Sequence, residues 1–241
     1  MFGLGTIINT VAIVVGGIFG ALFGKLLKER HQDSLQKACG VCVLFIAIAG
    51  ALEGMMTVTD TGLSGGRALL IVGSIALGCF VGELLNIERW FEAFGEWLKE
   101  KTGNSKDAGF VNGFITASFT VCIGAMAIVG SIEDGLTGDY SILLTKAILD
   151  LIIIVVMTCS LGKGCIFSAI PVFLFQGSVT LLAVLIKPLM TEAALGNLSL
   201  VGNILIFCVG VNLVWGKKFR VANMLPAVFL AAAAAFLPIA L

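Results

Sequence analysis

Long apolar runs constrain this chain more than any other feature of its sequence. A helix needs about 20 mostly apolar residues to cross the hydrocarbon core of a bilayer. Only 12% of the residues are charged and 59% are hydrophobic, whereas soluble domains typically have about 25% and about 45–50%. The sequence therefore predicts an all-α, polytopic transmembrane helical bundle, forming one integral membrane domain over residues 1–241. About eight spans are expected, at 3–24, 38–56, 67–86, 109–131, 141–162, 165–187, 199–216 and 221–240.

The distribution of positive charge predicts the orientation of these spans. If the N-terminus lies outside, all of the 15 Lys and Arg residues except Arg67, Lys146 and Lys187 fall on the inner side. An excess of Lys and Arg is typical of inner loops. Residues 1–12 carry no charge, so the first run lacks the basic region of a cleavable signal and is expected to stay as a span. We expect a multi-pass protein of the cell (inner) membrane with both termini outside.

Residues 87–101 have a different pattern from the predicted spans. Trp90, Phe94 and Trp97 recur at helical spacing, and Glu and Lys residues fill the other face. This pattern predicts an amphipathic helix that lies in the inner membrane interface, with its tryptophans at headgroup level. Docking of a soluble partner is the alternative. The polar residues 102–108 that follow are expected to form a mobile inner loop.

Small residues recur every four positions in the first span. Gly16, Gly20 and Gly24 fall on one stripe, which lets another helix backbone approach closely. The stripe favours helix packing, either within the chain or in a homodimer, over the lining of a pore. Asn9 lies in the outer half of the same span.

The sequence contains two internal repeats. Residues 47–53 and 62–66 resemble residues 127–133 and 135–139, so the second and third spans match the fourth and fifth. In a second repeat, the fifth and sixth spans match the seventh and eighth. Both pairs have a glycine at the end of the first span and a proline early in the second. Carrier folds often contain repeats with sites at the repeat interface, but duplicated helices also build inert scaffolds.

The prolines of the second repeat are Pro171 and Pro226, which follow Gly162 and Gly216 by nine and ten residues. Each proline is expected about one turn into its helix. There it either occupies the tolerated first turn or kinks the helix.

Lys146 and Asp150 lie inside the apolar fifth span, four residues apart and therefore on one helix face. A central Asp or Lys costs about 2.5–3.5 kcal/mol on insertion scales, and such residues usually face the bundle interior or a wet cavity. The first repeat copy has Gly73 and Leu77 at these positions, so the charges belong to the second copy alone. We hypothesise a functional pair; a self-neutralising pair that only pins the span is the alternative.

Other polar residues are weaker candidates for a substrate or ion site. Asp139 can cap the helix that begins near Ser141, because the dipole at a helix N-terminus favours negative charge. The outer carboxylates form either a solvated rim or an acidic vestibule that concentrates cations. These carboxylates, and three amides that could line a path, are Glu53, Glu133, Asp134 and Asp139, and Asn9, Gln176 and Asn223.

The sequence shows no catalytic constellation, and we expect no enzyme, no cofactor and no nucleic-acid partner. It lacks a nucleophile elbow, a zinc-protease motif and a phosphate-binding loop. Cys39-x-x-Cys42 has a metal-like spacing but no second ligand pair, so helix packing is favoured over a metal site.

Several segments together resemble a known family. They are Gly5-Thr-Ile-Ile-Asn9, Gly16-Gly17, Glu-Asp-Gly-Leu-Thr-Gly-Asp-Tyr-Ser-Ile-Leu at 133–143, Lys146, Leu149-Asp150, Ser160-Leu-Gly162 and Asn223-Met-Leu-Pro-Ala227. In these the chain resembles the domain-of-unknown-function 554 membrane proteins of prokaryotes over essentially its whole length. The resemblance implies a multi-span inner-membrane protein that is often described only as a candidate transporter, and it supplies no substrate.

Two functional hypotheses follow. The preferred one is a transporter or channel for a small polar or charged solute, in which Asp150 binds a cation or proton and Lys146 holds the counter-charge or switches partners. The alternative is a non-transporting scaffold or regulatory protein of the lipid bilayer, acting through the glycine stripe and the amphipathic helix. A homodimer through Gly16, Gly20 and Gly24 is compatible with either.

Overall fold

The chain folds into helices joined by short connections and one β-hairpin. The computed structural model describes residues 2–60 and 62–237. The first part comprises α1 (Leu4–Gly24), α2 (Glu29–Met55), β1 (Met56–Thr59), β2 (Gly62–Gly65), α3 (Ala68–Leu85), α4 (Ile87–Lys101), α5 (Phe110–Cys122) and α6 (Ala125–Thr137). The second comprises α7 (Ser141–Leu161), η1 (Lys163–Ser168), α8 (Ala169–Leu181), α9 (Ala183–Ile186), η2 (Lys187–Leu189), α10 (Glu192–Trp215), α11 (Val221–Met224) and α12 (Pro226–Ala234).

The prediction of an all-α membrane bundle is confirmed. Among the described residues, six helical segments are long and apolar enough to cross a membrane: α1, α2, α3, α7, η1 with α8, and α10. Two of the eight predicted spans need correction. The run at 109–131 is divided into α5 and α6, and the run at 221–240 forms the shorter α11 and α12, with residues 238–241 outside the described part.

The break between α5 and α6 has a local backbone cause. Ile123 is extended, and Gly124 has φ 154° and ψ 149°, a conformation that is essentially restricted to glycine. The α-helical hydrogen bonds cannot continue through this pair, and the two helices meet at 63°. The span predicted at 109–131 is therefore a bent pair of helices rather than one continuous helix.

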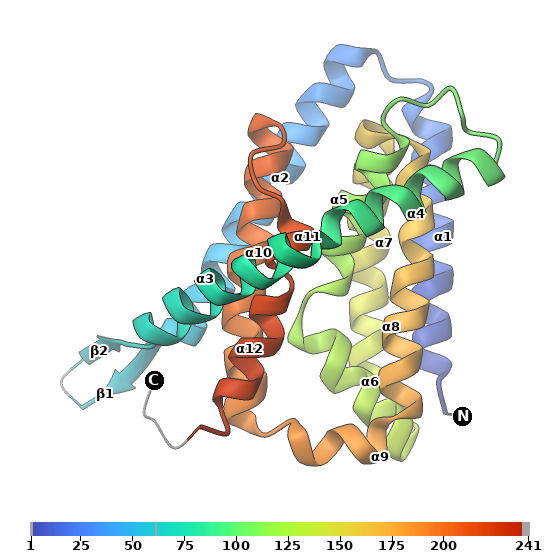
Figure 1. Cartoon of the computed structure of the whole chain (residues 1–241). Coiled ribbons are helices and arrows are strands. Elements are labelled where there is room, and N and C mark those ends of the chain that lie inside the picture. The colour runs from blue at the N-terminus through green and yellow to red at the C-terminus, as the bar shows by residue number, and fades with distance from the viewer. Residues whose placement is uncertain (1, 61, 238–241) are drawn as a thin grey trace.

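The ends of the bundle differ in charge. In Figure 1, α1 begins and α12 ends at the lower end of the bundle. The α1–α2 connection, the α4–α5 loop and the α7–η1 junction lie at the opposite, upper end. These three connections carry basic residues, so the end at which α1 begins is the end poor in positive charge.

The glycine stripe of α1 packs against α7 of the same chain. A Cβ atom at Gly16 would lie 2.7 Å from the carbonyl oxygen of Leu151, and one at Gly20 would lie 2.5 Å from that of Val155. One turn further on, Gly24 meets the backbone of Cys159. Of the two expectations for the stripe, packing within the chain is the one observed. The stripe is covered by α7 and is not a free surface for a second copy.

A comparable contact joins α2 to α10. Gly40 meets Leu213 and Val214, whereas Gly54, later in α2, meets Leu200, earlier in α10. The two helices are therefore antiparallel, while α1 and α7 run in the same direction. In both pairs, small residues replace side chains at the contact, which is how membrane helices approach closely.

The second repeat is visible in the backbone. Gly162 and Gly216 end α7 and α10 with nearly the same dihedral angles, φ 91°, ψ −173° and φ 78°, ψ 176°. Pro171 then lies in the first turn of α8, and Pro226 is the first residue of α12. Of the two expectations for these prolines, the tolerated first turn is the one observed.

Helix α4 has the bounds predicted for the amphipathic helix. Trp90 and Trp97 are exposed on it, as expected. Glu88, however, was assigned to the polar face and is buried, because this part of α4 packs against α11. The hairpin β1–β2 between α2 and α3 was not predicted.

Candidate functional site

Lys146 and Asp150 form a buried ion pair on α7. The two residues are 7% and 4% exposed, and Lys146 Nζ contacts Asp150 Oδ2 one helical turn away. The predicted shared face is thus the buried face of the helix. Because buried charges are costly unless paired and hydrogen-bonded, the further partners of these groups decide what the pair can do.

Lys146 has a second partner at the break between α5 and α6. Its Nζ donates a hydrogen bond to the carbonyl oxygen of Val121, at 2.7 Å. In a continuous helix that oxygen would accept the N–H of residue 125, but the turn at Gly124 removes this donor. The end of α5 also carries partial negative charge. Lys146 is therefore held by a full charge on α7 and a partial charge on α5.

Two amide side chains complete this buried region. Asn9 of α1 donates from Nδ2 to Oε1 of Gln176 of α8, at 3.2 Å, and both side chains are fully buried. The Asn9 side chain also lies near the Asp150 carboxylate. Asn9 Oδ1 and Gln176 Nε2 have no hydrogen-bond partner among the described residues. We call Asn9, Lys146, Asp150, Gln176 and the Val121 carbonyl the polar centre.

Asp134 does not belong to an outer rim. Its side chain is fully buried and accepts hydrogen bonds from the N–H groups of Gly3 (3.2 Å) and Gly5 (3.0 Å). Asp134 of α6 thus satisfies backbone donors at the start of α1, where the helix dipole favours a negative charge. The expectation of a solvated or vestibular carboxylate is wrong for this residue.

The remaining outer carboxylates are not gathered into one acidic vestibule. Asp139 is exposed and accepts the Ser141 N–H (2.9 Å) and hydroxyl (2.6 Å) at the start of α7, close to the predicted capping role. These two hydrogen bonds lower the pKa of Asp139. Glu133 lies on α6, whereas Glu53 is near the end of α2, which Figure 1 places across the bundle from α6.

Asn223 lies at a different place from the polar centre. Its Oδ1 accepts the backbone N–H of Glu88 at 2.7 Å, so it caps the start of α4. The side chain is fully buried, and its Nδ2 has no hydrogen-bond partner in the described chain. Of the three amides expected to line a path, Asn9 and Gln176 are in contact and Asn223 is elsewhere.

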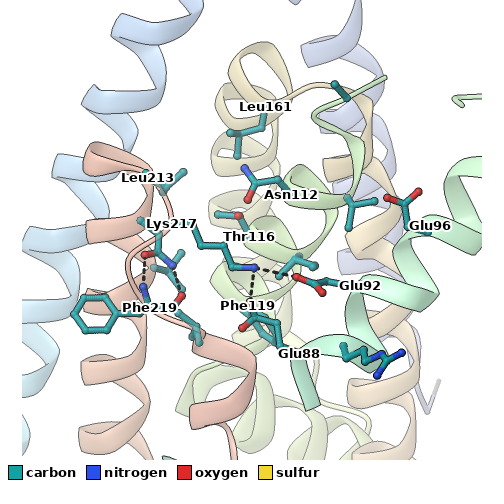
Figure 2. A pocket seen from close by; sticks show the side chains of 18 of the residues that line it. Glu88, Glu92, Glu96, Asn112, Thr116, Phe119, Leu161, Leu213, Lys217 and Phe219 are labelled. Carbon is teal, nitrogen blue, oxygen red and sulfur yellow. Dashed lines mark hydrogen bonds and ion pairs between the residues drawn. The ribbon is translucent and has the colours of Figure 1, made fainter. Parts of the chain in front are cut away.

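A cavity of about 680 Å³, with charged and apolar side chains in its lining, lies between α4, α5 and the end of α10. Lys217 reaches into it and pairs with Glu88 at 2.5 Å and Glu92 at 2.9 Å, as Figure 2 shows. Glu88 is only 3% exposed. Burial alone would lower the pKa of Lys217, but its hydrogen bonds to the two carboxylates outweigh this and raise it. We call this space the inner cavity.

A second, apolar cavity of about 380 Å³ shares one wall with the inner cavity. Phe119 lines both spaces, and its ring packs on that of Phe91 with 5.0 Å between centroids. The apolar cavity is also lined by Cys122 and Gly124 at the helix break. Cys122 directly follows Val121, whose carbonyl oxygen accepts the hydrogen bond from Lys146. One aromatic wall therefore separates the inner cavity from a space that adjoins the polar centre.

The described residues do not assemble a metal-binding site from protein side chains. No group of three His, Cys, Asp or Glu side chains is placed to hold a metal ion within 2–60 and 62–237. All seven cysteines are free thiols.

Comparison with known proteins identifies the family. The chain matches the family model described as "Protein of unknown function (DUF554)" over residues 4–236. The chain belongs to this family. It is 34% identical over 226 residues to the uncharacterized membrane protein YdfK of Bacillus subtilis (strain 168), covering 94% of this chain and 93% of the relative. It is 29% identical over 232 residues to the uncharacterized protein YqgA of Escherichia coli (strain K12), covering 95% and 94%. No solved structure matches.

The part matched to the DUF554 family contains the whole polar centre and the residues that line the inner cavity. The resemblance noted from the sequence motifs is thereby confirmed, together with a multi-pass membrane protein as the class. Neither relative's name gives a substrate.

Sequence reasoning missed three elements of the candidate site: the Val121 carbonyl, the Lys217–Glu88–Glu92 cluster and the Phe91–Phe119 wall. A backbone carbonyl leaves no signal in side-chain identity, and the glycine at 124, where the helix breaks, is by itself a weak one. Lys217 stands beside the repeated Gly216, but its equivalent Lys163 is exposed and has no carboxylate partner in the described chain.

Proposed function

We propose that this DUF554 protein is a membrane transporter or channel for a small polar or charged solute, with the polar centre as its principal site. The observation that carries the proposal is the buried Lys146–Asp150 pair tied to the end of a broken helix. Intramembrane ionisable residues by default mark ion or substrate pathways. Discontinuous helices near mid-membrane are a recurrent way of building such sites in carriers.

The two cavities supply an access route in this proposal. A solute would enter the inner cavity past Glu92 and Lys217, pass the wall formed by Phe91 and Phe119, and reach the break beside Cys122. The carboxylates favour a cationic or zwitterionic solute over an anion. The apolar part of the route suits a small organic body better than a bare, hydrated ion.

The orientation follows from the same proposal. The basic connections at one end of the bundle would face the cytoplasm under the positive-inside rule, which places both termini outside the inner membrane. The inner cavity would then open to the cytoplasm. Helix α4, with Trp90 and Trp97 exposed, would lie in the inner interface.

Transport is tested with purified protein in proteoliposomes on a solid-supported membrane. Charge movement is recorded during jumps of Na⁺, K⁺, and panels of amino acids and organic amines. We expect a solute-dependent current in the wild type that is lost in Asp150→Asn. Asp33→Asn is the matched control, because Asp33 forms an exposed ion pair with Lys37 at the same four-residue spacing. A current unchanged in Asp150→Asn would contradict the proposal.

A scaffold or regulatory function is the second candidate, favoured by the exposed tryptophans of α4. Its other motivation has weakened, because the α1 glycines are occupied by α7. On this reading Lys146 and Asp150 only hold helices together. The double variant Lys146→Leu with Asp150→Leu would then keep its fold and thermal stability. For a transporter, the same variant would lose the solute-dependent current.

A further inference from the structure

The two buried amides of the polar centre cannot satisfy each other. Asn9 and Gln176 share one hydrogen bond, and one polar atom on each is left without a partner. Turning both amides round exchanges donor and acceptor but still leaves one atom unpaired on each side chain. Because an unpaired buried polar group costs about 1–3 kcal/mol, an arrangement with two of them calls for a third polar species.

Several oxygen atoms lie around these two amides. Asn9 Oδ1 has no partner in the described chain, the Asn9 side chain lies near the Asp150 carboxylate, and Lys146 bridges Asp150 to the Val121 carbonyl. Carboxylate, amide and backbone carbonyl oxygens are the ligands of hard cations. Half-helix C-terminal ends and unwound carbonyls coordinate Na⁺ in carriers with broken helices.

The charges select the valence of such a cation. The polar centre holds one carboxylate and one ammonium group, so a divalent ion would add two positive charges where only one negative charge is present. A monovalent cation can replace Lys146 as the partner of Asp150, provided that the Lys146 ammonium keeps another hydrogen-bond acceptor. The carbonyl of Val121, at the partially negative end of α5, is that partner.

We propose that Asp150, Asn9 and the broken end of α5 form a binding site for a monovalent metal cation, and that the Lys146 ammonium occupies it when the cation is absent. Lys146 is thus a tethered competitor. When the cation binds Asp150 and Asn9 Oδ1, Lys146 retreats onto the Val121 carbonyl. This site deepens the transport function proposed above by naming a coupling-ion class, but its occupancy can be measured without any transport.

The test is the thermal unfolding of the detergent-purified full chain in NaCl, KCl or choline chloride at equal ionic strength. A ligand that binds only the folded state raises the Tm. We expect Na⁺ or K⁺ to raise the Tm of the wild type by at least about 2 °C over choline, the shift expected for roughly 1 kcal/mol in a chain of this size. Asp150→Asn should lose this shift, and the exposed control Asp33→Asn should keep it.

A second variant gives a signature that a merely structural ion pair cannot produce. Lys146→Gln removes the competitor while leaving the carboxylate, so the cation concentration needed for half-maximal stabilisation should fall by about tenfold or more, equivalent to 1.4 kcal/mol. The half-maximal concentration in Lys146→Gln therefore tests the proposal even if Asp150→Asn fails to fold. Asn9→Leu should move the half-maximal concentration the other way.

The outcomes separate the two proposals. A Tm that responds alike to Na⁺, K⁺ and choline in both the wild type and Lys146→Gln would overturn the cation site and leave a structural water between the amides. Cation stabilisation without any solute current would support the site and contradict transport. A solute current that does not depend on Na⁺ or K⁺ would support transport and contradict a coupling role for the site.

Discussion

Lys146 donates a hydrogen bond to the carbonyl oxygen of Val121 across the break between α5 and α6. The contact joins residues on different helices and couples the charge state of α7 to the geometry of α5. If Lys146 moves, the end of α5 loses its positively charged partner. If α5 moves, Lys146 loses the Val121 carbonyl and keeps only Asp150 as its partner. The charged pair and the broken helix are thus joined in one structural unit.

The Lys146–Asp150 pair should be strongly coupled in stability. Lys146→Met leaves Asp150 buried without a cation and should lower the free energy of unfolding by about 3–5 kcal/mol at neutral pH. Replacing both residues by leucine should cost less than the two single changes added together. A double-mutant cycle on thermal unfolding measures this difference. The exposed Lys37–Asp33 pair should give less than about 1 kcal/mol, and a similar value for the buried pair would contradict its burial.

The glycine stripe of α1 predicts a stability effect that is independent of transport. Gly20→Val should destabilise by about 1–3 kcal/mol, because its side chain would be forced against the Val155 carbonyl. Gly73→Ala is the control, since no atom outside the local helix backbone lies within 4 Å of the added Cβ. It should be neutral or stabilise by about 0.5–1 kcal/mol, owing to the better helix propensity of alanine. Thermal unfolding reports both, and loss of a dimer without loss of stability in Gly20→Val would contradict the contact with α7.

The helical spans could be predicted from sequence because their causes are local. Hydropathy located α1 to within a residue of its observed start, and the amphipathic period gave both bounds of α4. The repeated glycine and proline positions predicted where α7 and α10 end. The break at Gly124 escaped, because one glycine inside an apolar run is usually compatible with a helix.

The polar centre could be predicted only in part. The cost of burying Lys146 and Asp150 marked them as candidates without any knowledge of the fold. The role of Asp134 could not be derived, because its partners Gly3 and Gly5 are about 130 positions away and are backbone groups. Glu88 was misassigned for a related reason: the amphipathic pattern of α4 separates polar from apolar faces but does not say which charged residue meets Lys217.

Asp134 should act as a cap and Glu133 should not. Asp134→Ala removes the acceptor for two N–H groups at the start of α1 and should lower the free energy of unfolding by about 0.5–2 kcal/mol. The neighbouring Glu133→Gln should change it by less than about 0.5 kcal/mol. Hydrogen exchange at the first turn of α1 locates the effect. If Glu133→Gln instead lowered cation-dependent current while Asp134→Ala left stability unchanged, the acidic-vestibule interpretation would be restored.

Lys217 should hold α4 against the end of α10 in a pH-dependent way. Lys217→Gln leaves the buried Glu88 without a cation, so the Tm should fall more than in the control Lys218→Gln. The raised pKa of Lys217 means that its contribution is fully present below the unfolded pKa of lysine, about 10.4, and is lost as pH rises through the folded value. The Tm difference between wild type and Lys217→Gln should therefore be constant near neutrality and shrink above about pH 10. A difference that vanished on acidification from pH 8 to 6 would contradict this assignment.

The wall between the two cavities should control access to Cys122. In a chain that keeps this cysteine alone, Phe119→Ala removes the ring shared by both cavities and should speed modification of Cys122 by a charged methanethiosulfonate reagent. An aromatic pair is worth about 0.5–1.5 kcal/mol, which corresponds to a two- to tenfold increase in rate. Phe91→Ala should act in the same direction, since the two rings pack together.

The matched control for this wall is Phe167→Ala, which disrupts another aromatic pair, with Phe110, at 5.2 Å between centroids. It removes the same number of atoms but no lining of either cavity, so the labelling rate should not change. Equal acceleration by Phe167→Ala would show that labelling reports general loosening of the bundle. Acceleration confined to Phe91→Ala and Phe119→Ala would assign the inner access route to this wall, because Phe119 lines both cavities and Phe91 packs on it.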